Sequence, residues 1–396
     1  MYLCKFFCAL FKDISMKVLI LTASTGGGHN TTAKALKTTI ENADSNATVE
    51  IVEALAYCSK FYNKFICGGY LFFATKMPKF YGKMYVNSDK ESALNNLCNK
   101  LNMRVGRKLV SLFEGFKPDA IISCHPFITA MLSDLKEKNK LSVPAISILT
   151  DFSPHRTCFF PKIDGYVISH KEMIKDILKY NTVSEKELYP LGIPVYEKFY
   201  KQIDKEKLAK ELGFSLNKPT ILFMAGSFGV KSILNYYKSF VKTDADCQCI
   251  VITGKNEKLY KAFDKYLNNS ENPQKPTKLF QFVNNVEEYM HFADLVATKP
   301  GGLTVSESLA CHLPMAIYSA FPGVEEGNAN YLIGQNAAVS LDDNCDIAAK
   351  QLADLVSNPD KLKEMKQKCQ KIAKPYSALN TYKLAQQLAK DKEDVK

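Results

Sequence analysis

The stretch TKPGGLTVSESLA, residues 298–310, has the pattern of a buried strand end, a glycine turn and a helix start. The surrounding sequence predicts four elements in order: a strand at 293–297, a turn at 299–302, a helix from about Thr304 to Cys311, and a second strand at 314–318. Gly301 and Gly302 let a ligand approach the backbone closely, and the unpaired amides and dipole of a helix N-terminus favour negative charge. The stretch therefore predicts an anion site in an open α/β sheet.

Glu307, one turn into this helix, has two interpretations. In the first, the amides of Leu303, Thr304 and Val305 point at a ligand, and the Glu307 carboxylate accepts hydrogen bonds from a sugar diol, as the acidic residue of a dinucleotide site holds a ribose. In the second, Thr304 is the N-cap of the helix and Glu307 is its partner in a capping box. The pattern alone leaves both open.

Length and composition indicate a soluble protein of two domains. The chain has 396 residues, of which 46% are apolar and 23% are charged, and two domains of about 180 residues each are expected at this length. Its twelve cysteines include no CxxC pair, so we expect neither a metal site nor disulfides, and a reducing cytoplasm. No apolar stretch approaches the roughly 20 residues that span a bilayer. Residues 1–15 are interpreted as an extension before the fold.

A second glycine loop opens the chain. Residues 17–22 predict a short buried strand, and the loop STGGGH at 24–29 leads into a helix expected from Thr31 to about Asn42. Gly26, Gly27 and Gly28 leave room for a substrate or phosphate against the backbone. His29 follows at the helix N-terminus, where the dipole should lower the pKa of its imidazole and keep it able to accept a proton. The alternative is a structural histidine.

Residues 57–108 carry most of the net charge. Ten basic residues stand against two acidic ones, which gives +8 of the chain's +11, and ten phenylalanine and tyrosine residues lie among them. Aromatic residues among lysines suit an anionic membrane surface or single-stranded nucleic acid. Alternatively, the aromatics are the core of two packed helices and the lysines their solvated face. The residues expected at a membrane are Phe72, Phe73, Lys76, Lys79 and Lys83.

The remaining pattern predicts two similar α/β units. Further strands are expected at 118–123, 143–149 and 165–169 in the first unit, and at 219–225, 249–253 and 278–283 in the second, with closing helices to Lys390. Residues 191–195 are the expected exit from the first unit and 201–210 a lysine-rich linker. Parallel strands deliver their following residues to one edge of a sheet, where ligands bind. We therefore expect domains at 16–195 and 196–377.

Taken together, six motifs resemble one family. They are STGGGH at 24–29, TDF at 150–152, LGIP at 191–194, GSFG at 226–229, KPGGLTVSE at 299–307 and PGVEEGNA at 322–329. In this order and spacing they resemble the monogalactosyldiacylglycerol synthase and processive diacylglycerol glucosyltransferase group, which is related to the peptidoglycan N-acetylglucosaminyltransferase that makes lipid II. The resemblance implies a GT-B glycosyltransferase: two Rossmann-like domains facing across a cleft, with the acceptor in the first, the nucleotide sugar in the second, and a final helix from about 378 to 396 crossing back.

The resemblance also implies roles for single residues. The diphosphate loop would comprise Gly226, Ser227, Phe228 and Gly229, the backbone of Val283 would meet the base, and the phosphates would lie at Gly301, Gly302, Leu303 and Thr304. Glu307 would hold the ribose, and Glu325 and Asn328 the sugar. His29 matches the histidine proposed to deprotonate or orient the acceptor hydroxyl, with Asp151 and then His155 as alternatives. Val324 and Tyr196 depart from residues common in these relatives.

The expected function is thus an inverting glycosyltransferase that moves a hexose from UDP-glucose or UDP-galactose to diacylglycerol. No cofactor, metal or nucleic acid is expected, and the protein should attach peripherally to the inner face of the cell membrane. Displacing a nucleotide diphosphate requires amides that stabilise the leaving group and a base near the attacking hydroxyl. Three alternatives remain: a UDP-N-acetylglucosamine-dependent transferase to another lipid, a sugar-nucleotide epimerase of the same fold, and a non-enzymatic nucleotide- or RNA-binding protein.

Overall fold

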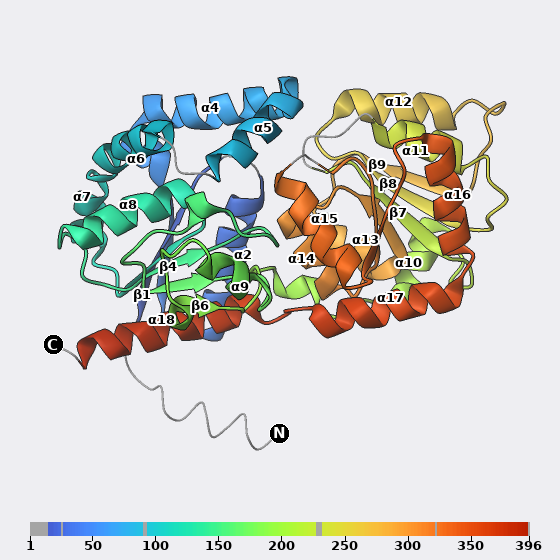
Figure 1. Cartoon of the computed structure of the whole chain (residues 1–396). Helices are drawn as coiled ribbons and strands as arrows, with labels where there is room; N and C mark the ends of the chain where they lie inside the picture. The colour runs from blue at the N-terminus through green and yellow to red at the C-terminus, as the bar shows by residue number, and fades with distance from the viewer. Residues whose placement is uncertain (1–14, 25–26, 90–92, 227–231, 321–322, 395–396) are drawn as a thin grey trace, which may run out of the picture.

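Two parallel six-stranded sheets, each covered by helices on both faces, make up the computed structural model of the protein (Figure 1). It describes residues 15–24, 27–89, 93–226, 232–320 and 323–394. Each sheet has a buried core of aliphatic strand residues, such as Leu19 and Ile121 in the first and Ile221 and Val251 in the second. The α/β class with two Rossmann-like domains is therefore confirmed.

The first sheet has the strand order β2-β1-β3-β4-β5-β6, with all of its strand pairs parallel. Its strands are β1 Lys17–Thr22, β2 Thr48–Glu53, β3 Ala120–Ser123, β4 Ala145–Ile148, β5 Gly165–Val167 and β6 Leu188–Tyr189. Strands β2 and β6 lie at the sheet edges and were not predicted. Their residues alternate in burial or form only a two-residue bridge, so the sequence contains no continuous apolar run there.

The helices of the first domain include a group that rises above the sheet. The helices of this domain are α2 Gly27–Ala43, α3 Ala54–Cys58, α4 Lys60–Lys76, α5 Pro78–Ser88, α6 Ala93–Gly106, α7 Leu109–Phe116, α8 Pro126–Glu137 and α9 Met173–Leu178, with 3₁₀ turns η1 Arg156–Cys158 and η2 Glu185–Glu187. A third 3₁₀ turn, η3 Glu197–Phe199, packs on α13 and α14 of the second domain. The basic aromatic segment thus folds into several helices, α3 to α6, rather than two. Pro78 is the first residue of α5, where a proline is tolerated and separates two helices.

The second sheet has the order β12-β11-β10-β7-β8-β9 and is also parallel. Its strands are β7 Thr220–Met224, β8 Gln248–Ile252, β9 Thr277–Phe280, β10 Leu295–Thr298, β11 Met315–Ile317 and β12 Ala338–Ser340. Its helices are α10 Lys205–Leu212, α11 Ser232–Phe240, α12 Glu257–Leu267, α13 Val286–Phe292, α14 Gly302–Ala310, α15 Val324–Gly334, α16 Cys345–Val356 and α17 Pro359–Ile372. Half of the predicted linker at 201–210 is therefore helix α10, which Asp204 caps.

The last helix, α18 Ser377–Glu393, packs on the first domain (Figure 1). The Ser377 hydroxyl donates to the carbonyl oxygen of Ile193 (2.8 Å), and the Tyr382 hydroxyl donates to Asp44 on α2 (2.7 Å). Lys392 forms an ion pair with Asp164 (2.9 Å). The described part of the chain thus begins and ends in the first domain, and α17 and α18 connect the second domain back to it.

Each of the two glycine loops lies at the point where the strand order of its sheet reverses. Strand order reverses between β1 and β3 in the first sheet and between β7 and β10 in the second. In open α/β sheets the ligand crevice lies outside the carboxyl ends of the strands at this point. The loops after β1, β3, β7 and β10 are therefore where a ligand is expected.

Candidate active site

His29 lies in the first turn of α2, which begins at Gly27 rather than at Thr31. Its Nδ1 is 2.6 Å from the carbonyl oxygen of Cys124, at the end of β3. A carbonyl can only accept, so Nδ1 carries the proton and Nε2 is left with the lone pair that can take a proton from a substrate. Burial lowers the pKa of His29 to about 4, and the bond to Cys124 opposes this. The expected low pKa thus has burial, not the dipole, as its largest cause.

A second histidine, His125, lies beside His29 and was not singled out from the sequence. The two rings meet edge to face with centroids 4.7 Å apart. His125 is buried, its Nδ1 accepts from the backbone N–H of Phe127 at the start of α8, and burial lowers its pKa. Two neutral imidazoles therefore share the switch point of the first sheet. Position directly after a buried strand was the signal that could have identified it.

Asp151 lies in the loop after β4 and is half-buried. Its pKa is raised to about 6: burial is the largest cause, the hydrogen bond from Asn328 opposes the shift, and the nearby Glu325 carboxylate adds to it. The residue before it, Thr150, places its hydroxyl oxygen 3.4 Å from His29 Nδ1. The loop that carries Asp151 therefore contacts His29.

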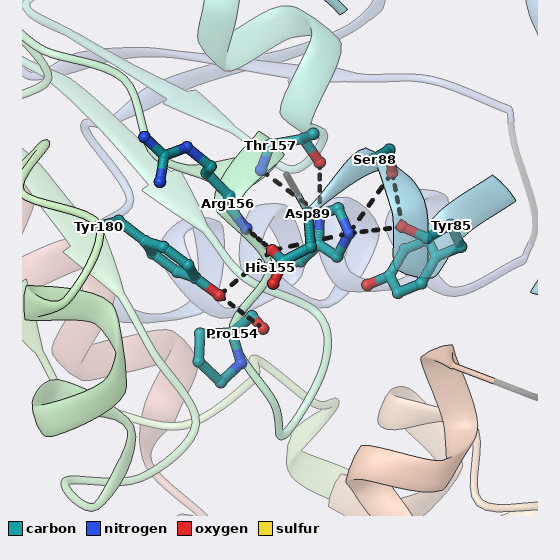
Figure 2. Close-up of polar contacts among 8 residues, drawn as sticks. All are labelled: Tyr85, Ser88, Asp89, Pro154, His155, Arg156, Thr157 and Tyr180. Carbon is teal, nitrogen blue, oxygen red and sulfur yellow. Dashed lines mark hydrogen bonds and ion pairs between the residues drawn. The ribbon is translucent and has the colours of Figure 1, made fainter. Parts of the chain in front are cut away.

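His155 belongs to a different cluster, shown in Figure 2. Its Nδ1 is 2.7 Å from the Thr157 hydroxyl and its Nε2 is 3.0 Å from the carbonyl oxygen of Tyr85 on α5. The Tyr85 ring packs against the His155 ring at a centroid distance of 4.1 Å. Both ring nitrogens thus have partners, and the contacts with Tyr85 fix α5 to the loop after β4. The structure does not bring His155 together with His29, so it is not retained as a base.

The glycine turn after β10 differs in one detail from the expected one. Helix α14 begins at Gly302 with Gly301 as N-cap, so Thr304 is not the N-cap and the capping box with Glu307 is wrong. The N–H of Val305 bonds to the carbonyl oxygen of Gly301 (2.9 Å), so it belongs to the helix ladder. The first turn can thus offer a ligand the amides of Gly302, Leu303 and Thr304.

Glu307 is buried in the second turn of α14. Burial raises its pKa to about 8, Lys198 opposes this shift, and Glu287 adds to it. Burial of the Tyr196 ring raises the pKa of its hydroxyl, and the nearby Glu307 carboxylate raises it further. Burial disfavours the charged form of such a carboxyl group, so a ligand hydroxyl that donates a hydrogen bond to it would stabilise that charged form.

Lys198, in η3, is a site residue that sequence reasoning missed. Its Nζ is 2.7 Å from Glu287 and 2.9 Å from the carbonyl oxygen of Asn284, next to Val283. It also lies 5.9 Å from the centre of the Tyr196 ring. Lys198 therefore connects the loop that leaves the first domain to the region of Glu307 and Val283. It stands in a lysine-rich run where nothing in the sequence marks it.

Of the other residues expected at the donor, Glu325 and Asn328 lie beside the turn after β10. Gly226 follows β7 and has a left-handed conformation (φ +70°). Ser227, Phe228 and Gly229 lie outside the described residues, as does Gly26. Val283 is half-buried after β9. Glu325, at the start of α15, lies 3.6 Å from Lys299, and its Oε1 lies 3.9 Å from a Cβ built on Gly301. Asn328 is buried, and two of its three hydrogen-bond partners, Phe152 and Asp151, belong to the first domain.

The two helix N-termini meet across the domains. A Cβ built on Gly28 would lie 3.9 Å from the Cβ of Leu303, so the glycine turn of α2 lies against the first turn of α14. The first turns of α2 and α14 are thus close together between the two sheets, with His29 in the first turn of α2. Among the described residues, no group of three or more His, Cys, Asp or Glu side chains could hold a metal ion.

Helices α4 and α5 present apolar side chains to solvent. Phe61, Phe65 and Phe72 are 82%, 68% and 54% exposed, and their spacing places them on one stripe of α4. Phe73 is half-buried, Lys83 is exposed, and the side chains of Lys76 and Lys79 are outside the described set. No helix in the described ranges is long and apolar enough to cross a membrane.

Comparisons with known proteins agree with this architecture. The family model described as monogalactosyldiacylglycerol (MGDG) synthase matches residues 29–195, and that of the glycosyltransferase family 28 C-terminal domain matches residues 220–387. A processive diacylglycerol beta-glucosyltransferase of Bacillus cereus is 30% identical over 91% of both chains. MurG of Acinetobacter baumannii superposes with a TM-score of 0.60 at 14% identity, covering 94% of this chain and 99% of MurG. UDP-GlcNAc 2-epimerase from Neisseria meningitidis, bound to UDP-GlcNAc, gives 0.59 at 12%, covering 94% and 100%.

The fold neighbours include both transferases and epimerases, so fold alone does not separate these classes. The sequence matches do: the protein is a glycosyltransferase of GT-B architecture. It belongs to the processive diacylglycerol beta-glucosyltransferase family.

Proposed function

We propose that the protein transfers a hexose from a UDP-sugar to the hydroxyl group of diacylglycerol with inversion, giving a β-glycosyl-diacylglycerol. The observation that carries the proposal is the 30% identity over 91% of both chains to a relative of that acceptor specificity. The relative's name favours UDP-glucose over UDP-galactose. Two residues depart from those common in this group. Val324 is next to Glu325 in the sequence. Tyr196 is close enough to Glu307 for the charge of that carboxylate to raise its pKa.

The proposed mechanism uses the described groups. Nε2 of His29 takes the proton of the acceptor hydroxyl as oxygen attacks the anomeric carbon, and Asp151 is the second candidate for this role. The amides of Gly302, Leu303 and Thr304, with the glycine loop at 226–229, stabilise the departing diphosphate. Glu307 holds the ribose and Glu325 the sugar. No metal or cofactor enters this scheme.

The test of this function is direct. Purified protein is incubated with labelled UDP-glucose, UDP-galactose or UDP-N-acetylglucosamine and diacylglycerol vesicles, and the lipids are separated. Label in a lipid from UDP-glucose supports the proposal, and the number of lipid products shows how many sugars are added. Transfer from UDP-N-acetylglucosamine alone, or release of an epimerised nucleotide sugar without lipid product, would establish an alternative instead.

Glu307→Ala is expected to weaken UDP-glucose binding about 10- to 150-fold, because the carboxylate's bonds to a diol contribute about 1.5 to 3 kcal/mol. The pKa of Glu307 is raised to about 8 in the free protein, and ribose hydroxyls that donate to it favour its charged form. Donor binding should therefore release a proton, so wild-type affinity should rise from pH 6 towards pH 8 and this slope should vanish in the variant. Calorimetry in buffers of different ionisation heat measures both. Unchanged affinity and slope would make Glu307 a structural residue.

We further propose that helices α4 and α5 lie on the cytoplasmic face of an anionic membrane, because the acceptor is insoluble. Each lysine near such a surface contributes about 1 kcal/mol. Lys76→Glu, Lys79→Glu and Lys83→Glu combined should abolish sedimentation with phosphatidylglycerol vesicles at low salt and spare UDP binding. Salt should weaken wild-type attachment too, since the Debye length falls from about 10 Å at 0.1 M to about 3 Å at 1 M.

A matched control for this triple variant is available on α17. Lys363, Lys366 and Lys371 are exposed, and α17 lies on the side of the molecule away from α4 (Figure 1). Changing these three to glutamate alters the net charge equally and should leave vesicle binding intact. Equal loss of vesicle binding in both variants would mean that net charge alone drives attachment. If neither variant lost vesicle binding, these lysines would not contact the membrane.

A further inference from the structure

Asn328 on α15 is a buried polar side chain, and two of its three hydrogen-bond partners lie across the domain boundary. It is fully buried. Its Oδ1 accepts from the backbone N–H of Phe152 (2.6 Å), and its Nδ2 donates to Asp151 Oδ1 (3.0 Å) and to the carbonyl oxygen of Pro300 (2.9 Å). An asparagine amide has two N–H donors, and both are used here. A sugar could gain a bond from Nδ2 only at the expense of one of these contacts.

The surroundings of Asn328 show that this contact between domains is closely fitted. A Cβ built on Gly302 would lie 1.9 Å from the carbonyl oxygen of Thr150, and one built on Gly327 would lie 2.1 Å from the Ser153 hydroxyl oxygen. Glycine is thus required on both sides of Asn328 for the second domain to reach the loop 150–153.

An aromatic stack closes the other side of this contact. The Tyr331 ring of α15 stacks on the His170 ring of the first domain at a centroid distance of 3.8 Å, and Phe152 stacks on Tyr331 at 5.3 Å. His170 Nε2 is also 2.9 Å from the carbonyl oxygen of Phe152. The loop that carries Asp151 is thus held by packing from the second domain as well as by Asn328.

We propose that Asn328 is a positioning residue: when the two domains close, its amide holds the loop 150–153, whose Thr150 contacts His29, and orients the Asp151 carboxylate; it is not a ligand of the sugar. This inference rests on the proposed glycosyl transfer for the role of Asp151, but the grip itself does not depend on which donor or acceptor is used. Domain closure and assembly of the base are thereby one event. Donor bound to the second domain alone would meet an incomplete site.

Charge around Asp151 supports this assignment. Glu325 of α15 faces Asp151 from the second domain and Lys299 pairs with Glu325, while Cys158 lies near Asp151 on its own side. A carboxylate beside another carboxylate needs a hydrogen-bond donor to fix its orientation and to favour its charged form. Asn328 is the neutral group of α15 that supplies one.

The test separates sugar binding from positioning by comparing two ligands. For Asn328→Ala, the ratio of the dissociation constants of UDP-glucose and UDP is expected to stay within about twofold of wild type, while kcat falls about 10- to 100-fold, as for a lost bond to a charged group. Glu325→Gln is the comparison, because a sugar contact should change the ratio. A ratio altered at least tenfold in Asn328→Ala with kcat retained would make Asn328 a sugar ligand and overturn the proposal.

A second readout is independent of turnover. The chain has no tryptophan, so Tyr331→Trp places one fluorophore against His170, and its response to UDP reports closure. Asn328→Asp, which is isosteric, should suppress this response by setting two carboxylates against each other. Adding Asp151→Asn reverses donor and acceptor and should partly restore it. No suppression in Asn328→Asp, or no restoration in the double variant, would contradict the grip. Because closure is measured without acceptor, a failed transfer assay leaves this result interpretable.

Discussion

His29→Ala is expected to lower kcat by about 100-fold or more and to leave UDP binding near wild type. A general base acts mainly in the transition state and contributes typically about 100- to 10,000-fold. The geometry supports this role because Nδ1 is bound to the Cys124 carbonyl and Nε2 keeps its lone pair. With a pKa of about 4, the ring stays neutral throughout the range in which the protein is assayed. Steady-state kinetics with a saturating donor, combined with calorimetry of UDP, measures both quantities.

His155→Ala is the matched control for this prediction. His155 is buried; its Nδ1 contacts the Thr157 hydroxyl and its Nε2 contacts the carbonyl oxygen of Tyr85 (Figure 2). Its removal should lower the melting temperature and loosen α5, with a smaller effect on kcat. If His29→Ala retains turnover and Asp151→Asn does not, the base is Asp151, and the acid limb of the pH profile should lie near its pKa of about 6.

The sequence predicted the positions of the site better than its contacts. Glycine loops followed by helices placed His29 and Gly302 correctly, because loop position relative to a buried strand is a local property. The helix starts were wrong, since Gly27 and Gly302 are already helical. Glycine is unfavourable in a helix interior but costs less in a first turn whose amides are free. Periodicity that begins at the first apolar residue cannot show this.

Contacts between the domains could not be predicted from local patterns. Asn328 falls in a motif that implies sugar binding, yet its partners Asp151 and Phe152 are more than 170 residues away in sequence. Such pairs depend on how two separately folded sheets are placed, and neither hydrophobic period nor turn chemistry encodes that placement. The resemblance to a family supplied the pairing of domains but not these bonds.

Gly327→Ala should lower kcat by about 100-fold, with the fold intact. A Cβ at this position would lie 2.4 Å from the Cβ of Ser153 and 2.1 Å from its hydroxyl oxygen, so the domains could not close to their observed distance. A displacement of about 1 Å between reacting groups can cost about 100-fold in rate. Gly327 lies inside α15 without a left-handed φ, where alanine favours the helix by about 1 kcal/mol. In this variant kcat should therefore fall while the melting temperature stays the same or rises.

Removing the opposing side chain should reverse the effect. Ser153→Gly deletes both atoms that the new methyl group would meet, so Gly327→Ala with Ser153→Gly should recover much of the lost kcat, whereas Ser153→Gly alone should stay near wild type. Gly334→Ala in the same helix, with nothing within 4 Å of its added Cβ, controls for helix stabilisation and should be neutral. Because Gly327 and Ser153 lie in different domains, rescue of one by the other can occur only if the reaction passes through the closed arrangement. Full activity in Gly327→Ala would show that transfer takes place in a more open one.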